Sequence, residues 1–186
     1  MFPQNSIAFK EWAVVCAALA QGRQSLILRK GGIHEGRDGF RVQHGEFWLF
    51  PTGFHQQADD VIPDARPLLE QVTATDTSQT SLSLYAVVAD VHHVEDLATL
   101  GRLSGRHIWS EKTVDQRFHY RAPGLFVLVV RLYRCQFPID LVVTPHMSGC
   151  KSWVDLPTAI STGELQPILD DATFETQRGE INALLS

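Results

Sequence analysis

The segment from Leu125 to Tyr133 constrains the fold more than any other part of the sequence. Its centre, LFVLVV, is apolar without interruption, and such a run is typical of a strand that is buried on both faces inside a sheet. Helical and strand patterns mix along the rest of the chain without a regular βαβ rhythm. The sequence therefore predicts an α+β fold with a mixed, mainly antiparallel sheet or a small barrel and flanking helices.

Periodicity and turn residues place the other elements. Apolar residues spaced near 3.6 predict helices at residues 7–22, 64–72, 90–103, 110–118 and 171–185. Ser6 and Ser110 are candidate N-caps, and Gly22 is expected to end the first helix. Strands are predicted at residues 25–29, 47–50, 82–91 and 138–143, besides the central one. The polar run 73–80 is predicted to be a loop.

The length of 186 residues predicts a single domain spanning residues 1–186. Hydrophobic residues make up 44% of the chain, which argues against disorder. No apolar run approaches the ~18 residues of a membrane helix, and the N-terminus lacks the pattern of a signal peptide. We therefore expect a cytoplasmic protein that does not bind membranes.

Cysteine and histidine spacing gives no clear metal or cofactor motif. Cys16, Cys135 and Cys150 lie far apart and form no C-x-x-C pair, so they are interpreted as reduced thiols. The H-E-x-x-H, G-x-G-x-x-G and G-x-S-x-G patterns are absent. No metal ligand set is predicted and the cofactor is unknown. The alternative is a metal site formed by His34, Glu35, His55 and one of the pair His92 and His93.

Charge is distributed unevenly, although the net charge is −5. Residues 102–134 hold seven Lys or Arg and two Asp or Glu, whereas residues 57–101 hold one and eight and residues 135–186 hold two and seven. A basic segment within an acidic chain indicates a local anion site. The alternative is that its arginines pair with the acidic segments across the fold.

The first candidate site segment is Arg29-Lys30-Gly31-Gly32, followed by Glu35. Two cations end a strand, and the glycines allow backbone N–H groups to approach an anion closely. Arg29 can hold a phosphate or carboxylate with two parallel hydrogen bonds. Glu35 is a candidate acid, base or metal ligand. The alternative is a hairpin turn stabilised by an ion pair between Arg29 and Glu35.

The second candidate segment directly follows a strand and contains Thr52, His55 and Gln56. Loops at strand ends often carry functional sites. His55 is the best candidate for a general base because the ordinary pKa of histidine is about 6.5. Thr52 and Gln56 are candidates to orient a ligand. The alternative is a turn in which Thr52 and His55 bond their own backbone.

In the third candidate segment arginines and aromatic residues alternate. Trp109 and Tyr120 are candidates to stack on a base, and Arg117 and Arg121 to hold its phosphate. Arg117 and Arg121 would share one helix face if the helix continued that far. The alternative is packing of the aromatic residues in the core with the arginines in solvent.

The fourth candidate segment is Ser148 to Trp153. Gly149 suggests a special backbone angle, and Lys151 beside Cys150 favours a lowered thiol pKa. Lys151 and Trp153 are candidate ligand-binding residues. Cys150 is a candidate nucleophile with His55 as its base, or, alternatively, a structural thiol.

Several motifs in this order resemble a family of prokaryotic proteins known as a domain of unknown function. They are Glu11-Trp12, RKGGIHE, LFPTGFHQ, the RFHYR region and GCKSWVDL. The resemblance covers nearly the whole chain. It implies no activity, because the family has none assigned.

A more distant likeness concerns the segment from Gly22 to Arg29, which follows the first predicted helix. It is similar to the opening of ASCH domains, which are small PUA-like barrels thought to bind RNA or modified nucleotides. Those domains carry a lysine two residues after the glycine and an acidic residue before the arginine. Here Gln24 replaces the lysine and the acidic residue is missing. The resemblance implies a PUA-like barrel.

The leading hypothesis is a domain that binds a nucleotide, RNA or DNA. Arg29, Lys30, Arg117 and Arg121 would hold phosphates, and an aromatic residue among Trp109, Tyr120 and Trp153 would stack on a base. A second hypothesis is a phosphodiesterase-like hydrolase with His55 as base, Glu35 as acid or metal ligand and Arg29 as oxyanion stabiliser. A third is a module that binds a protein partner through an exposed apolar patch.

Overall fold

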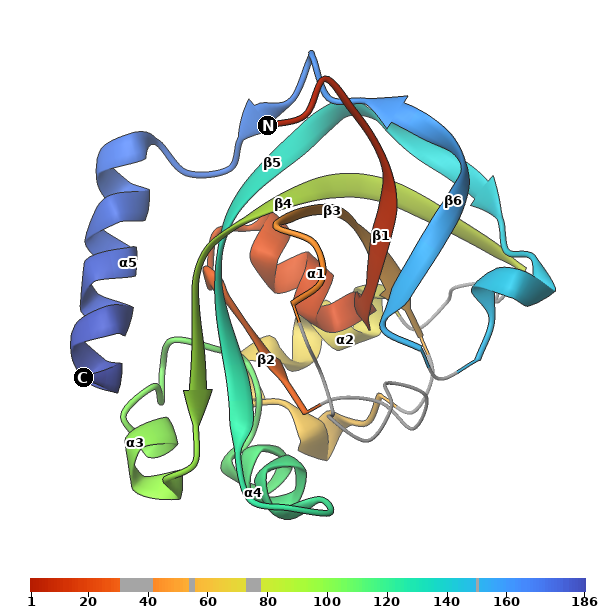
Figure 1. The fold of residues 1–186 in the computed structure, drawn as a ribbon. Helices are drawn as coiled ribbons and strands as arrows, with labels where there is room; N and C mark the ends of the chain where they lie inside the picture. Colours follow the sequence, from red (N-terminus) through yellow and green to blue (C-terminus); the bar gives the residue numbers. More distant parts are fainter. Residues whose placement is uncertain (31–41, 54–55, 73–77, 150) are drawn as a thin grey trace.

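A single curved sheet organises the chain (Figure 1). The computed structural model describes residues 1–30, 42–53, 56–72, 78–149 and 151–186. The strand order is β2-β5-β4-β3-β1-β6, with β7 paired to β5. β1 and β3 are parallel, and the other pairs of strands are antiparallel. The predicted α+β class with a mixed, mainly antiparallel sheet is therefore confirmed.

The strands are β1 (Gln4–Trp12), β2 (Leu26–Arg29), β3 (Glu46–Thr52), β4 (Gln79–Val94), β5 (Leu125–Val142), β6 (Trp153–Ser161) and β7 (Gln166–Pro167). The α-helices are α1 (Ala13–Ala20), α2 (Arg66–Val72), α3 (Leu97–Gly101), α4 (Glu111–His119) and α5 (Asp171–Leu185). Short 3-10 turns are η1 (Ala58–Asp60), η2 (Pro63–Ala65) and η3 (Pro145–Met147). None of the helices in the described ranges combines the length and apolar character that a membrane span requires.

The central strand and the last helix were predicted correctly. Val127 to Val130 of β5 have no exposed surface, as expected for a strand buried on both faces. Helix α5 has the predicted bounds. Helix α4 begins where expected, because the side chain of Ser110 accepts a hydrogen bond from the backbone N–H of Thr113.

The first predicted helix was wrong at its start, because residues 4–12 form a strand. β1 lies between β3 and β6 and shares backbone hydrogen bonds with both. Asn5 supports an irregularity in the register with β6: its side chain donates to the Glu46 carbonyl and the Tyr85 hydroxyl, both at 2.9 Å, and accepts from the Ile7 N–H at 2.8 Å. Long-range pairing therefore overrides the local helical spacing.

Two further predictions were wrong because β4 and β5 are longer than their apolar centres. Residues 90–94, predicted as the start of a helix, belong to β4 and pair with β5, and α3 begins at Leu97. The predicted separate strand 138–143 largely continues β5 to Val142. Strand β6 was not predicted. It carries Pro157, which is tolerated at a sheet edge because it needs no N–H partner there.

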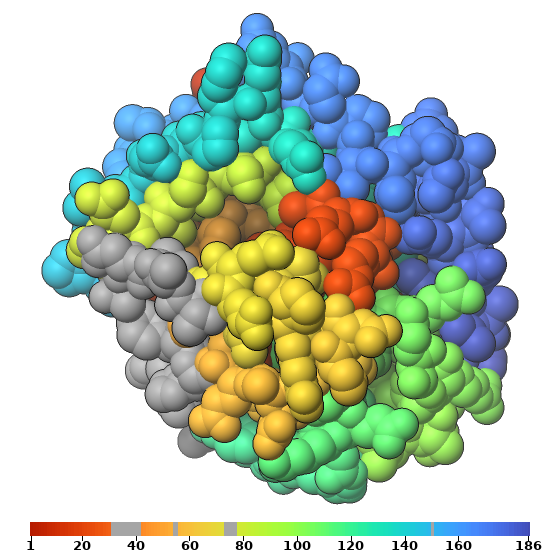
Figure 2. Space-filling view, turned by 180° about the vertical axis from the view of Figure 1, so that it is seen from behind, coloured from red at the N-terminus to blue at the C-terminus, as the bar shows by residue number. Residues whose placement is uncertain are grey.

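Helix α1 packs in the main core between the sheet and α2 (Figure 2, where the orange-red α1 and the yellow α2 region lie side by side). Six of its eight residues are buried, so the helix is apolar on nearly all sides, as expected of a helix inside a core. Its C-terminus ends in a Schellman motif, in which the N–H groups of Gly22 and Arg23 bond the carbonyls of Leu19 and Ala18 at 3.0 Å. Gly22 ends the helix, as predicted.

Helix α5 is docked by charged contacts as well as by two buried side chains, Phe174 and Ile181. Arg178 holds Asp90 of β4 with two hydrogen bonds, Nε to Oδ2 at 2.6 Å and Nη2 to Oδ1 at 3.0 Å. Arg106 pairs with Glu180 at 2.7 Å, and Arg131 pairs with Asp171. Part of the basic segment therefore pairs with the acidic C-terminal segment, as the alternative interpretation predicted.

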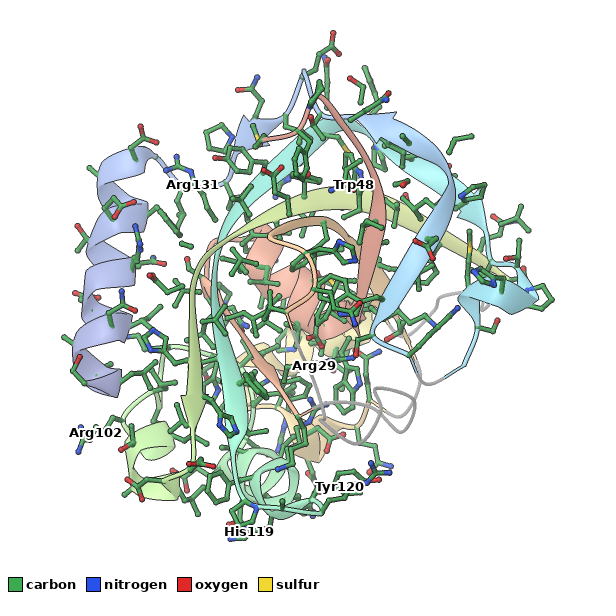
Figure 3. The ribbon with its side chains drawn as sticks, viewed as in Figure 1. Arg29, Trp48, Arg102, His119, Tyr120 and Arg131 are labelled. Atoms are coloured by element: carbon green, nitrogen blue, oxygen red, sulfur yellow. The ribbon has the colours of Figure 1, made fainter. Side chains whose placement is uncertain are left out.

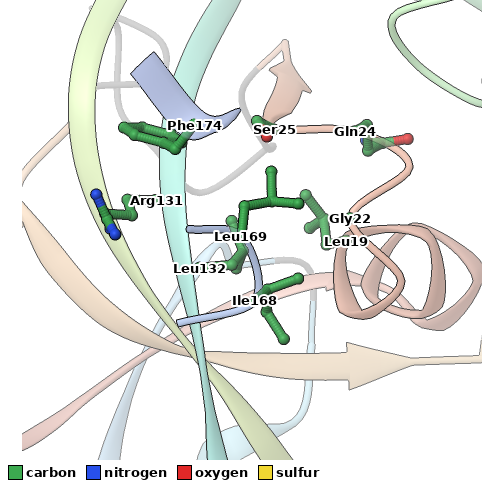
Figure 4. Close-up of a pocket in the computed structure, with 9 residues that line it drawn as sticks. All are labelled: Leu19, Gly22, Gln24, Ser25, Arg131, Leu132, Ile168, Leu169 and Phe174. Carbon is green, nitrogen blue, oxygen red and sulfur yellow. The ribbon is translucent and has the colours of Figure 1, made fainter. Parts of the chain in front are cut away.

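A small pocket lies where the segment before α5 meets the end of α1 (Figure 4). It is lined by nine residues that include Gly22, Leu169 and Arg131, and its volume is about 10 Å³. That space holds at most about one water molecule, so the pocket is not a ligand site. A Cβ atom at Gly22 would lie 2.8 Å from Cδ2 of Leu169, and the φ angle of Gly22 is +66°.

We predict that Gly22→Ala lowers the free energy of unfolding by about 2 kcal/mol, because it adds left-handed backbone strain to a clash with Leu169. The matched control is Gly179→Ala in α5, where a Cβ atom meets nothing within 4 Å. That variant should gain up to about 1 kcal/mol from helix propensity. Urea denaturation measures both, and equal effects of the two substitutions would contradict the structure.

The hydrogen bonds from Arg178 lower the pKa of Asp90. Because the pKa is lower in the folded state than the ordinary aspartate value of about 4, Asp90 adds stability above about pH 4. This stability is lost as the pH falls through the folded-state pKa. We predict that Asp90→Asn costs about 1 kcal/mol at pH 7, and that the difference from the parent protein shrinks below about pH 4. Urea denaturation across pH measures this, with exposed Asp140→Asn as control; a constant difference would contradict the prediction.

Candidate anion site at the closure of the sheet

The two edges of the sheet, β2 and β6, meet at Arg29. These strands lie at opposite ends of the strand order. Nevertheless, Nη2 of Arg29 donates a hydrogen bond to the hydroxyl of Ser152, directly before β6. The carbonyl of the buried Ser152 accepts a hydrogen bond from the Lys10 N–H of β1 at 2.8 Å. A side chain, rather than a backbone ladder, therefore closes the curved sheet at this point.

Glu11 of β1 lies next to Arg29 and is buried, with 1% of its surface exposed. Its Oε1 atom accepts the Trp12 N–H at 2.7 Å, and its Oε2 atom lies 4.0 Å from Nη1 of Arg29. The guanidinium of Arg29 also lies 4.8 Å from the ring centre of Phe9. Within the described residues, Oε2 of Glu11 and Nε of Arg29 are buried without a hydrogen-bond partner.

Arg117 of α4 is held between two tryptophan rings. Its guanidinium carbon lies 4.8 Å from the ring centre of Trp12 and 4.3 Å from that of Trp109. The two rings contact each other edge to face at 4.6 Å. Cation–π contacts of this kind orient a guanidinium and stabilise its charge. The strand–helix junction at Trp12 and the start of α4 thus fix the position of Arg117.

A pocket of about 220 Å³ is lined by Arg29, Lys30, Arg117 and Tyr120. All four were predicted to bind a ligand, and the fold brings them together from β2 and α4. In Figure 3 Arg29 lies near the centre of the view and Tyr120 lies below it beside α4, whereas Arg102 lies beside α3 and Arg131 beside α5. The pocket therefore joins the first and third candidate segments into one site.

The ammonium group of Lys30 is fully engaged by the protein. It donates hydrogen bonds to the carbonyls of Phe118 at 3.0 Å, Gly124 at 2.7 Å and Ala122. An ammonium group has three donors, so these bonds use all of them. Burial lowers the pKa of Lys30. Lys30 fixes the end of α4 and supplies positive charge to the pocket, but it has no free donor for a ligand.

The described residues that line the pocket carry an excess of positive charge. Burial lowers the pKa of Arg117, and the positive charge of Arg29 lowers it further. The carboxylates of Glu11 and Asp60 raise it. Arginine nevertheless remains charged in proteins. Among the described residues, Arg29, Lys30 and Arg117 bring three positive charges to the pocket, and the buried carboxylate of Glu11 and the half-buried Asp60 offset them in part. Such an arrangement favours an anion in the pocket, because an additional negative charge offsets the repulsion between Arg29 and Arg117.

Tyr120 lines the pocket, and Arg121 lies beside its ring. Tyr120 is 48% exposed, and the guanidinium of Arg121 lies 5.2 Å from its ring centre. Arg121 has a φ angle of +66°, the one positive value among the non-glycine residues that the structure describes. Helix α4 ends at His119, close to its predicted end, so the condition for Arg117 and Arg121 to share one helix face is not met. The left-handed turn directs the chain away from the helix instead.

Thr52 and Gln56 lie beside the site but bond the backbone. The hydroxyl of Thr52 donates to the Glu11 carbonyl at 3.2 Å. The side-chain amide of Gln56 donates to the Thr52 carbonyl at 3.0 Å and accepts the Val14 N–H in the first turn of α1 at 2.9 Å. These contacts hold the junction between β1 and α1, which carries Glu11 and Trp12.

The remaining predicted aromatic residues have packing contacts. Trp109 is 2% exposed and contacts Arg117 and Trp12. Trp153 is half-buried against Phe9 and Phe47, with ring centres 4.8 and 5.2 Å apart. Lys151 is half-buried directly before Ser152. Of the three predicted stacking residues, only Tyr120 lines the pocket with a largely exposed ring.

Six candidate residues lie outside the described ranges: Gly31, Gly32, His34, Glu35, His55 and Cys150. The convergence of His55, Glu35 and Arg29 that the hydrolase hypothesis requires stays a prediction. Among the described residues, no cluster of three or more His, Cys, Asp or Glu side chains is arranged to hold a metal ion.

Sequence reasoning missed Glu11 and Trp12 as site residues. Both belong to a segment predicted as an amphipathic helix, where an acidic residue next to an apolar run is unremarkable. The signal available in the sequence was the Glu11-Trp12 motif itself. Its role depends on contacts with residues 29, 109 and 117, which are far away in the chain.

Residues 8–180 match the model of the family described as domain of unknown function (DUF1802), and the chain belongs to this family. A comparison with curated proteins produced no match. The crystal structure of ASCH from Zymomonas mobilis is similar in fold, with a TM-score of 0.46 at 12% sequence identity over 97% of this chain and 95% of that chain. Crystal structures of two mutant forms of that protein each align with 82% of this chain, both with a TM-score of 0.47. The alignment covers 88% of one mutant chain at 13% identity and 90% of the other at 14% identity.

We predict that Glu11→Gln lowers the free energy of unfolding by about 3 kcal/mol, because it removes the buried carboxylate that offsets the charges of Arg29 and Arg117. Added sulfate should restore part of this loss by occupying the pocket. The control is Glu175→Gln, an exposed partner of Arg178 on α5, which should change stability by less than about 1 kcal/mol. A loss in Glu11→Gln no larger than in the control would contradict the role of Glu11 as the central counter-ion.

Proposed function

We propose that this protein binds the phosphate of a nucleotide or of single-stranded nucleic acid between Arg29 and Arg117. The observation that carries the proposal is the pair of partly buried guanidinium groups that line one pocket, with the buried carboxylate of Glu11 4.0 Å from Arg29 and acting electrostatically on Arg117. Guanidinium groups bind phosphate through charge-assisted hydrogen bonds. Because the protein already fixes both groups, little order has to be created when a phosphate binds.

The size of the pocket favours a phosphate group with the rest of the ligand outside. Its volume of about 220 Å³ lies below the roughly 300–1,000 Å³ that encloses a whole small molecule. The largely exposed ring of Tyr120 stands at the rim, where a base adjoining the phosphate would stack on it. Arg121 beside this ring would meet a neighbouring phosphate of a longer strand.

We predict that Arg117→Lys weakens the binding of a short, fluorescein-labelled single-stranded RNA about tenfold, because the planar donor fork is lost while the charge remains. Arg29→Lys should have a similar effect. Arg102→Ala is the control, since Arg102 lies in the same basic segment but away from the pocket (Figure 3). Fluorescence anisotropy measures affinity, and binding by the parent protein should weaken steeply between about 50 and 200 mM salt.

An equal loss of affinity in Arg102→Ala and Arg117→Lys would contradict the proposed site, because binding would then reflect general surface charge. Salt-independent binding would contradict phosphate recognition. Comparison of RNA, DNA and a nucleoside monophosphate in the same assay separates a strand-binding protein from a nucleotide-binding one.

We also predict that Tyr120→Ala weakens binding about tenfold, because stacking on an aromatic ring contributes roughly 1–3 kcal/mol per base. Tyr120→Phe keeps the ring and should retain most of the affinity. The same anisotropy assay measures both variants. If inorganic phosphate competes equally well with the strand in Tyr120→Ala and in the parent protein, the loss belongs to the base and not to the phosphate pocket.

A further inference from the structure

Within the described residues, the hydrogen-bond donors of Arg117 are all without a protein partner. The guanidinium group is half-buried and contacts the rings of Trp12 and Trp109, but it takes part in no hydrogen bond and no ion pair there. Its nitrogen atoms are not among the fully buried atoms that lack a partner. The five N–H donors of this group therefore remain accessible to a ligand in the pocket.

Arg29 adds further donors to the same pocket. Its Nη2 atom donates one hydrogen bond to the hydroxyl of Ser152, and its Nε atom is fully buried. The Nη1 group and the second Nη2 hydrogen are left for a ligand. The two arginines together thus offer more donors than the two non-bridging oxygens of a phosphodiester can accept. A phosphomonoester presents three such oxygens.

The charge of the lining also favours a phosphomonoester. Arg29, Lys30 and Arg117 contribute three positive charges, which Glu11 and the half-buried Asp60 offset only in part among the described residues. At pH 7 a phosphomonoester carries about 1.5 to 2 negative charges, whereas a phosphodiester carries one. The additional negative charge offsets more of the repulsion between the two guanidinium groups.

The lining has one largely exposed side. Of its four residues, Arg29, Lys30 and Arg117 are half-buried, whereas Tyr120 is 48% exposed. Arg29 is tied to Ser152 before β6, and Lys30 is tied to three carbonyls at the end of α4 and in the turn that follows it. A ligand therefore extends from the pocket beside Tyr120. An internal phosphate needs two exits for its strand, but a terminal phosphate needs only one.

We infer that the pocket binds a terminal phosphate, that is, a phosphomonoester at the end of a strand or on a free nucleotide, in preference to an internal phosphodiester. This inference rests on the proposed function and names the chemical class of its ligand. Arg117 and Arg29 would hold the three terminal oxygens. The adjoining base would stack on Tyr120, and Arg121 beside that ring would meet the next phosphate of a strand.

Methyl phosphate and dimethyl phosphate test the inference on the unaltered protein. The first is a monoester and the second is a diester, and neither carries a base. Titrations followed through the side-chain Nε–H signal of Arg117 by NMR measure both affinities. We expect methyl phosphate to bind at least about tenfold more tightly, because it offers one more charged acceptor oxygen. Equal affinities, or tighter binding of dimethyl phosphate, would overturn the inference.

RNA strands of one sequence identify the source of the phosphate. One strand carries hydroxyl groups at both ends, a second carries a 5′-phosphate and a third carries a 3′-phosphate, and isothermal titration calorimetry measures their affinities. At least one phosphorylated strand should bind about tenfold more tightly than the unphosphorylated strand, and that strand identifies the preferred end. A nucleoside monophosphate that binds as tightly as this strand would identify a free nucleotide as a sufficient ligand.

Two variants locate the effect. Arg117→Lys should reduce the preference for the phosphorylated strand to less than about threefold, because a lysine retains the charge but lacks the planar donor fork. Arg102→Ala, beside α3 and away from the pocket (Figure 3), should leave the preference unchanged. A preference that persists in Arg117→Lys would place the terminal phosphate elsewhere and overturn the inference.

The same measurements separate this inference from the proposed function. Equal binding of all three strands that is lost in Arg117→Lys would overturn the preference for a terminal phosphate, while phosphate binding between Arg29 and Arg117 would stand. No binding of any strand, nucleotide or methyl phosphate would overturn both. If Arg117→Lys does not fold, the comparison of methyl phosphate with dimethyl phosphate on the parent protein still decides the inference.

Discussion

The buried carboxylate of Glu11 is the interaction on which the rest of the site depends. It lies at the end of β1, where the strand passes into α1, and it faces the guanidinium group that joins the two edges of the sheet. Glu11 also acts on Arg117, which is fixed by two tryptophan rings. Removing an ion from water is costly unless an opposite charge compensates. Glu11 therefore allows two arginines to be buried side by side at the closure of the sheet.

Two groups of arginines among the described residues have different roles. Arg106, Arg131 and Arg178 form ion pairs that dock α5 on the sheet. Arg29 and Arg117 instead line a pocket, and the buried carboxylate of Glu11 acts on both of them. The net charge of a segment does not distinguish these roles, because it does not say which residues meet in the fold. Only the second group has electrostatic capacity left for a ligand.

Sequence reasoning succeeded where the signal depends on residues that are neighbours in the chain, and failed where it depends on distant ones. The unbroken apolar run of β5 and the Ser110 cap depend on neighbouring residues and were predicted correctly. The spacing of residues 4–12 fits a helix, and their strand conformation comes from pairing with β3 and β6. Arg29, Lys30, Arg117 and Tyr120 were chosen for their chemistry and do line one pocket. Glu11 was missed because its partners lie on other elements, and no local pattern identifies them.

The most direct test of a phosphate site between Arg29 and Arg117 is a titration with inorganic phosphate, followed through the side-chain Nε–H signals of the arginines by NMR. The account predicts that the signals of Arg29 and Arg117 shift together with one dissociation constant, while those of Arg102 and Arg178 do not change. Similar shifts at all arginines, or no shift at Arg29 and Arg117, would contradict it.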